Sequence, residues 1–243
     1  MSKIISVWGS PNSGKTSLSV KLAELLYSRF HAVVGVVCAD MTAPALPVLF
    51  PNKKADEMFS LGEVLSKPEV TLHDVLNNVV TVRGKTNMGF LGLKDGENRF
   101  SYPSFDDVKA EALFSILKGL AEFLVVDCTS DIQNTLTASA IKRSDHIIRI
   151  VNPDLKSLSF FSSQLPLLGD PKYRRDEHLI CLNENEYKLF MPVQEAISHY
   201  GEVAFSFPYC PQLKTQYARG NLTDKVIDHH FDTVLSALAK RVV

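Results

Sequence analysis

The sequence has few cysteines, and none of them are paired at a metal-binding spacing. Its 243 residues include only four, which lie far apart along the chain: Cys38, Cys128, Cys181 and Cys210. This spacing argues against a CxxC metal site, and the composition argues against a disulfide scaffold. Each cysteine lies in or beside an apolar run, where a free thiol behaves as a small hydrophobic group. We therefore expect a reduced, cytoplasmic protein.

An excess of charge of one sign is also missing. The chain has 27 acidic and 26 basic side chains, a net charge of -1 at pH 7, so we expect no overall attraction to nucleic acid or to an acidic membrane. One local basic cluster, Lys172, Arg174 and Arg175, is typical of a solvated loop. A nucleic-acid or membrane surface thus stays open as a partner but is not indicated.

Long hydrophobic runs are absent as well. No stretch reaches the roughly 18 apolar residues of a membrane-spanning helix, and the first apolar run, residues 4–8, is too short for a signal peptide. We find no internal repeat, no low-complexity segment and no linker. These observations predict a single domain over residues 1–243.

Short apolar runs rich in Val, Ile and Phe recur along the chain, with helical patterns between them. The runs are residues 4–8, 32–39, 88–93, 123–126, 146–151, 178–182 and 203–207. Helical spacing of apolar residues follows the first run and returns at 108–120 and 223–240. This alternation predicts an α/β fold with a doubly wound, mainly parallel β-sheet flanked by helices. Ligands bind such sheets at the carboxyl ends of the strands.

A phosphate-binding motif follows the first apolar run. Its pattern, GxxxxGK[ST], is matched in full by Gly9, Ser10, Pro11, Asn12, Ser13, Gly14, Lys15 and Thr16, with Ser17 next along the helix. Glycines let backbone N–H groups turn toward phosphate oxygens, and the following helix presents its positive end to the same anion. We expect all nine residues to contact a nucleotide, with Lys15 at the β- and γ-phosphates.

A magnesium site is expected beside this loop. The Thr16 hydroxyl is one predicted ligand, and an aspartate at the end of another strand should provide a second. Asp127 ends the run Phe-Leu-Val-Val-Asp, and Asp40 ends the second apolar run. Both are candidates, and for each the alternative is an aspartate that caps a helix or closes a turn.

With these pieces in place, the chain resembles the ParA/MinD family of P-loop ATPases over nearly its whole length. The matching segments are the loop at 10–16, Cys-Ala-Asp at 38–40, Leu-His-Asp-Val-Leu at 72–76, the strand at 123–128, the strand ending in Asn183, the Phe-Pro turn at 207–211 and Ala-Arg-Gly at 218–220. The resemblance implies that Asn183 reads adenine and that Pro208 borders the base. It also implies ATP and Mg²⁺ as cofactors, catalytic roles for Lys15 and Asp40, and a nucleotide-dependent homodimer that positions a cargo or adaptor protein.

The chain differs from this family at positions that the family uses for hydrolysis within a dimer. The family has a lysine at the position of Ser10 that crosses to the partner's ATP, and two glycines at the positions of Pro11 and Asn12. Cys38 replaces the first family aspartate, and Thr129 the proline after the second strand-end aspartate. These changes are reminiscent of the TadZ/CpaE pilus-assembly branch, and they predict slow hydrolysis. The alternative is a scaffold that does not hydrolyse ATP and acts through protein–protein contacts.

Overall fold

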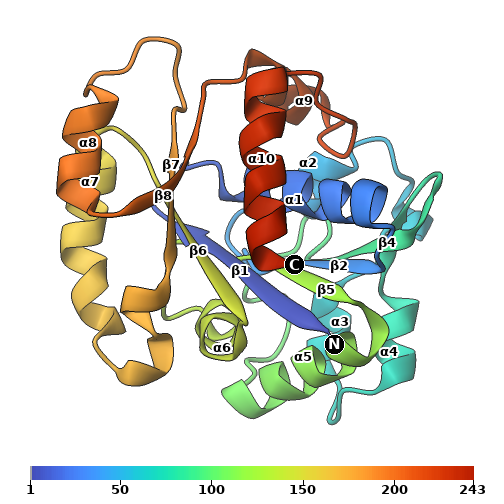
Figure 1. Cartoon of the computed structure of the whole chain (residues 1–243). Helices are drawn as coiled ribbons and strands as arrows, with labels where there is room; N and C mark the ends of the chain where they lie inside the picture. The colour runs from blue at the N-terminus through green and yellow to red at the C-terminus, as the bar shows by residue number, and fades with distance from the viewer. Residues whose placement is uncertain (1) are drawn as a thin grey trace.

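The computed structural model describes residues 2–243 and has a central β-sheet with helices on both faces (Figure 1). Within these residues the sheet has eight strands in the order β3-β4-β2-β5-β1-β6-β7-β8, and every neighbouring pair is parallel except β3 and β4. The strands are β1 (Lys3–Gly9), β2 (Val34–Cys38), β3 (Val80–Val82), β4 (Lys85–Leu91), β5 (Phe123–Asp127), β6 (His146–Val151), β7 (Leu179–Asn183) and β8 (Val203–Phe207). The predicted α/β fold is confirmed.

The helices fall into two layers, one on each face of the sheet. They are α1 (Lys15–Phe30), α2 (Leu46–Leu49), α3 (Leu61–Ser66), α4 (Leu72–Asn77), α5 (Asp107–Leu120), α6 (Thr135–Arg143), α7 (Leu155–Gln164), α8 (Val193–Tyr200), α9 (Pro211–Arg219) and α10 (His229–Val242). Alternate residues of β1 point to opposite faces. Ile5 and Val7 therefore pack with α1 and α10, whereas Ile4 and Trp8 pack with α5, α6 and α7.

The predicted first residue of the C-terminal helix was wrong. Helical spacing was expected from residue 223, but α10 begins at His229 because the Asp228 carboxylate caps it, accepting from the backbone N–H of Phe231 at 2.9 Å. The helix buries Phe231, Leu235 and Leu238 and contacts α1 and β8. It is thus packed against the body of the protein. No helix within residues 2–243 combines the length and the apolar character of a membrane span.

Strand β3 was not predicted from the sequence. It pairs with β4 as an antiparallel hairpin. The strand is only three residues long, and its turn contains Gly84 with a φ of 77°. A run this short carries too little alternation to be recognised as a strand.

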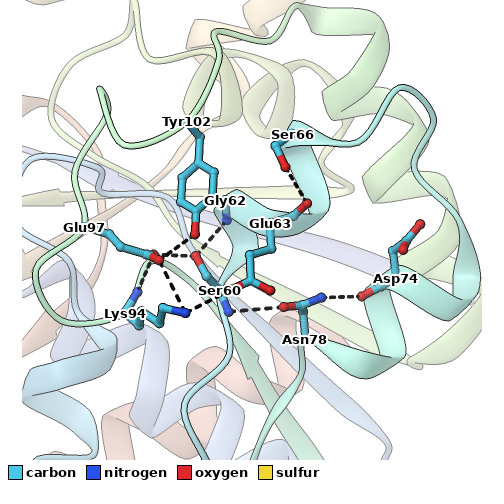
Figure 2. A network of polar contacts seen from close by, with 9 residues as sticks. All are labelled: Ser60, Gly62, Glu63, Ser66, Asp74, Asn78, Lys94, Glu97 and Tyr102. Atoms are coloured by element: carbon cyan, nitrogen blue, oxygen red, sulfur yellow. Dashed lines mark hydrogen bonds and ion pairs between the residues drawn. The ribbon is translucent and has the colours of Figure 1, made fainter. Parts of the chain in front are cut away.

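A polar network fastens the connection after β4 to helix α3 (Figure 2). The Glu97 carboxylate accepts hydrogen bonds from the hydroxyl of Ser60 at 2.5 Å and from that of Tyr102 at 2.6 Å. Ser60 also caps α3, accepting from the N–H of Gly62 at 3.0 Å. Further along the same connection, the N–H of Arg99 donates to the carbonyl of Met41 at 3.0 Å. The connection after β4 is therefore bonded both to α3 and to the loop that follows Asp40.

Gly62 lets the Tyr102 ring lie against α3, so Gly62→Ala should destabilise the fold. A Cβ at this position would lie 2.1 Å from Cε2 of Tyr102, and an overpacked site of this kind costs about 1–3 kcal/mol. Urea denaturation should show a lower free energy of unfolding. Gly119→Ala in α5 is the matched control, because a Cβ there would meet no neighbouring segment within 4 Å. Equal stability of the two variants would contradict the packing described here.

Candidate functional site

The loop between β1 and α1 requires glycine at both ends of the motif. A Cβ on Gly9 would lie 2.3 Å from the carbonyl oxygen of Ile150 on β6. Gly14 has a φ of 94°, and a Cβ there would lie 2.7 Å from Nδ2 of Asn183. Asn12 also has a positive φ of 61°. Gly14 is the N-cap of α1 and makes no side-chain cap bond, so the helix presents its first N–H groups at this loop, as an anion site requires.

Lys15 lies at the start of α1, with its ammonium under the loop. Its Nζ donates to the carbonyl of Ser10 and to the hydroxyl of Ser130, each at 2.8 Å. Burial lowers the pKa of Lys15, and the nearby carboxylates of Asp127 and Asp40 oppose that shift. The positive charge is thus held within the loop, and its contact with the β- and γ-phosphates stays a prediction.

Thr16 and Asp127 meet across the site. The Thr16 hydroxyl donates to Oδ2 of Asp127 at 2.7 Å. The residue is 3% exposed, and its second oxygen, Oδ1, is buried and has no hydrogen-bond partner by geometry within residues 2–243, although the Ser19 hydroxyl lies close enough to lower the pKa of this carboxyl. Burial raises the pKa of Asp127 to about 6. A buried carboxylate oxygen without a partner, beside a threonine hydroxyl, fits a hard cation such as Mg²⁺.

Asp40 follows β2 and closes a turn in this structure. Its Oδ1 accepts from the backbone N–H groups of Thr42 at 2.8 Å and Ala43 at 2.9 Å. The residue is half-buried, and its charge is close enough to act on the pKa of Asp127 and Lys15. The turn is the alternative anticipated for this aspartate. Its roles in metal binding and catalysis stay predictions.

Asn183 ends β7 and contacts the phosphate loop. Its Nδ2 donates to the carbonyl of Ser13 at 2.9 Å, and its own carbonyl accepts from Nδ2 of Asn152 at 2.8 Å. Asn183 is paired with Phe207 in the sheet, so Pro208 follows at the same edge. The two residues predicted to face the base are therefore brought together next to the loop, although base recognition by either stays a prediction.

Ser10 points into the protein. It is 1% exposed, and its hydroxyl donates to that of Ser157 at 3.2 Å. Ser157 in turn accepts from the backbone N–H of Asn152 at 3.0 Å. Among the other loop residues, Pro11 and Asn12 are exposed, Ser13 is buried, and Ser17 is half-buried in the first turn of α1. The position where the resembling family has a lysine is thus filled by a small, internally bonded side chain.

Three contacting residues were missed from the sequence: Ser130, Asn152 and Ser157. Asn152 directly follows the apolar run at 146–151, so the rule that chemistry lies at the carboxyl ends of strands could have found it. Ser130 and Ser157 stand 115 and 147 residues from the side chains that they contact. No local pattern reports a contact over that distance.

The basic cluster is largely neutralised by its own neighbours. Lys172 pairs with Asp170 at 2.6 Å, Arg175 with Asp176 at 3.1 Å, and Arg174 with Glu177 at 3.6 Å. Exposed pairs of this kind are typical of a solvated surface and contribute little to stability.

Comparison with known proteins gave matches in structure and none in sequence. No family model matches the chain, and no curated protein matches it. A ParA family ATPase from Chlorobium tepidum TLS superimposes with a TM-score of 0.79 at 12% identity, covering 98% of each chain. The chain has the fold of the ParA and MinD ATPases.

Two MinD structures agree with this assignment of the fold. The septum site-determining protein MinD of Pyrococcus horikoshii OT3, complexed with Mg-ADP, has a TM-score of 0.72 at 19% identity, covering 100% of this chain and 96% of that one. The MinC:MinD cell division complex of Aquifex aeolicus has a TM-score of 0.74 at 17% identity, covering 99% and 95%. At identities this low, the structural matches establish the fold alone. The activity has to be argued from the residues of the site.

Proposed function

We propose that this protein binds ATP with Mg²⁺ and hydrolyses it slowly, as a nucleotide-dependent dimeric switch of ParA/MinD type in the cytoplasm. The observation that carries the proposal is the arrangement at the first turn of α1. There the Lys15 ammonium lies within the loop, and Thr16 is bonded to a buried carboxylate with one oxygen that makes no hydrogen bond to residues 2–243.

The position of each residue in the site indicates which part of ATP·Mg²⁺ it would bind. The backbone N–H groups of the loop and Lys15 would bind the β- and γ-phosphates, with Lys15 exchanging its contacts to Ser10 and Ser130 for phosphate oxygens. Thr16 and Asp127 would hold Mg²⁺, which when bound neutralises negative charge on the phosphates. Asp40 would orient the attacking water. Asn183 and Pro208 would border the adenine.

The partners are inferred from the structural relatives. The Pyrococcus MinD is complexed with Mg-ADP and the Aquifex MinD with MinC, which supports a nucleotide-bound state and a protein partner for this chain. We infer a homodimer formed with ATP and a cargo or adaptor protein, in partition, septum placement or pilus or conjugation machinery. The altered loop favours a branch like TadZ/CpaE within this group.

A second function is favoured by Ser10. Because this side chain is uncharged and bonded inside the protein to Ser157, it supplies no cation to a partner's ATP. The protein would then bind nucleotide without turning it over and serve as a scaffold through protein–protein contacts.

One experiment separates the two functions. Light scattering of the purified protein should show a dimer with ATP and Mg²⁺ and a monomer without nucleotide, and a phosphate-release assay should show slow hydrolysis that Lys15→Ala removes. Dimerisation with ATP but no hydrolysis above the Lys15→Ala level would select the scaffold. Absence of any nucleotide effect would refute both.

The raised pKa of Asp127 predicts that the gain in ATP affinity from Mg²⁺ falls at acid pH. A carboxylate must be ionised to bind the cation, so a pKa of about 6 predicts a roughly tenfold loss of the Mg²⁺ effect between pH 7 and pH 5. Calorimetric titration with and without Mg²⁺ at both pH values measures it. Asp127→Asn is the control, because it corrects for titration of the nucleotide itself.

The raised pKa of Asp127 also determines how the stability of the fold changes with pH. The folded protein binds a proton at Asp127 more tightly than the unfolded chain, whose carboxyl titrates near pH 3.9. Without nucleotide, this residue therefore makes the fold more stable as the pH falls from 7 toward 4. Wild type should gain stability over this interval relative to Asp127→Asn, and identical pH profiles of unfolding would contradict the assigned burial.

A further inference from the structure

Lys21 is a buried lysine that the proposed chemistry does not use. It lies on α1, the helix that begins with the phosphate loop, and is 1% exposed. Its Nζ donates three hydrogen bonds, each of 2.5 Å, to Oε1 of Gln216 and to the carbonyl oxygens of Leu222 and Asp224. Burial lowers the pKa of Lys21 to about 8, so the ammonium with its three donors is the main form at pH 7.

All three acceptors belong to one segment of chain. Gln216 is on α9, and the two carbonyls lie in the connection from α9 to α10. A hydrogen bond within the segment joins its two ends, because Nε2 of Gln216 donates to the carbonyl of Lys225 at 3.1 Å. It also packs against α2 and the turn after it, because a Cβ on Gly220 would lie 2.1 Å from Cγ of Pro51 and 3.1 Å from the carbonyl oxygen of Val48. An ammonium buried among neutral oxygens is costly unless each donor is satisfied, so Lys21 and this segment constrain one another.

The segment is continuous with the turn expected to border the base. α9 begins at Pro211, directly after the turn that holds Pro208. Lys21, which holds this segment, lies on the same helix as Lys15, about 9 Å farther along the α1 axis. One rigid helix thus carries both the group for the phosphates and the group that holds the base-side segment.

We propose that Lys21 is a positioning residue that fixes the distance between the phosphate loop and the base-bordering segment, so that a nucleotide is bound by its phosphates and its base together. This inference rests on the proposed nucleotide function. It assigns Lys21 to the base half of the site, since the loop, Thr16 and Asp127 are formed without it. A ligand with phosphates but no base should therefore not depend on Lys21.

The test compares two ligands on two variants at pH 7. Lys21→Met should weaken the affinity for ATP·Mg²⁺ about fivefold to tenfold, because the three hydrogen bonds that order the segment are lost. Affinity for inorganic tripolyphosphate with Mg²⁺ should stay within about twofold, the change expected where no contact is lost. Lys85→Met is the matched control. Lys85 also donates to this segment, at the carbonyl of Thr223 (2.7 Å), but it extends from the hairpin and has Glu24 as a partner at 3.4 Å.

A rescue experiment separates positioning from general loss of structure. Lys21→Ala leaves three oxygens around the space of the ammonium, so ammonium chloride should restore part of the ATP affinity, and choline chloride at equal ionic strength should not. If Lys21→Met and Lys21→Ala do not fold, Gln216→Met, which removes one acceptor and keeps the charge, should give the same selective loss.

The outcomes are distinct. Unchanged ATP affinity in a folded Lys21 variant, an equal loss for ATP and tripolyphosphate, or an equal effect of Lys85→Met would each overturn the inference. Failure of the wild type to bind either ligand would instead refute the proposed function. In that case, unchanged hydrogen exchange of residues 211–226 between wild type and Lys21→Met would also refute the structural part of the inference.

Discussion

Wild-type protein should hydrolyse ATP at far below one turnover per second, at a rate per molecule that does not rise with protein concentration. A cation supplied across an interface accelerates phosphoryl transfer by factors on the order of 10³ to 10⁵. Here the corresponding position is Ser10, which is uncharged, 1% exposed and bonded to Ser157. Forming a dimer would therefore complete no catalytic site. Steady-state phosphate release over a range of protein concentrations measures this.

Ser10→Lys is the informative variant for this prediction, with Ser10→Ala as its control. A lysine cannot keep the buried place of the serine, and Pro11 fixes the backbone that would direct it, so we expect little concentration-dependent turnover to appear. Fast wild-type turnover that rises steeply with concentration would contradict this account. Arg83, Arg174 and Arg219 would then be tested as the source of the cation.

Lys15→Ala should weaken ATP binding by about 1.5–3 kcal/mol, a factor of ten or more, because it removes a charge-assisted contact to the phosphates. The structure adds a reason to expect the loss without unfolding. Within residues 2–243, the Lys15 ammonium bonds the carbonyl of Ser10 and the hydroxyl of Ser130, and both residues lie in loops between the helices and strands.

Competition against a fluorescent ATP analogue measures this loss. Lys240→Ala is a suitable control, because that lysine is exposed in the last turn of α10, near the edge of the sheet where Lys3 at the start of β1 donates to the carbonyl of Val242. Equal affinity of wild type and Lys15→Ala would refute the phosphate-loop assignment, whereas a loss confined to Lys15→Ala would support it.

The sequence predicted the sheet, and it picked out the phosphate loop and Asp127 as candidates, because these patterns are local. Each buried strand is a short apolar run, and the phosphate loop is continuous, so Gly14, Lys15 and Thr16 were recognisable together. Asp127 was recognisable because it ends such a run, and it meets Thr16 at 2.7 Å. The alternative for Asp40, a turn aspartate, was also recognised from its residue type.

What the sequence could not predict depends on contacts between distant segments. The burial of Ser10 against Ser157, the bond from Lys15 to Ser130 and the three acceptors of Lys21 join residues more than 100 positions apart. The start of the last helix was wrong for a different reason. Apolar residues at 226 and 227 continue the helical spacing, but the Asp228 cap decides where the helix begins.

The proposed function depends above all on binding of a nucleoside triphosphate with Mg²⁺ at the loop between β1 and α1. Calorimetric titration of the wild-type protein with ATP, in the presence of Mg²⁺ and then of a chelator, tests it most directly. The account predicts saturable binding of one ATP per chain that is tighter with Mg²⁺. No binding heat in either condition, or binding that is indifferent to Mg²⁺, would contradict it.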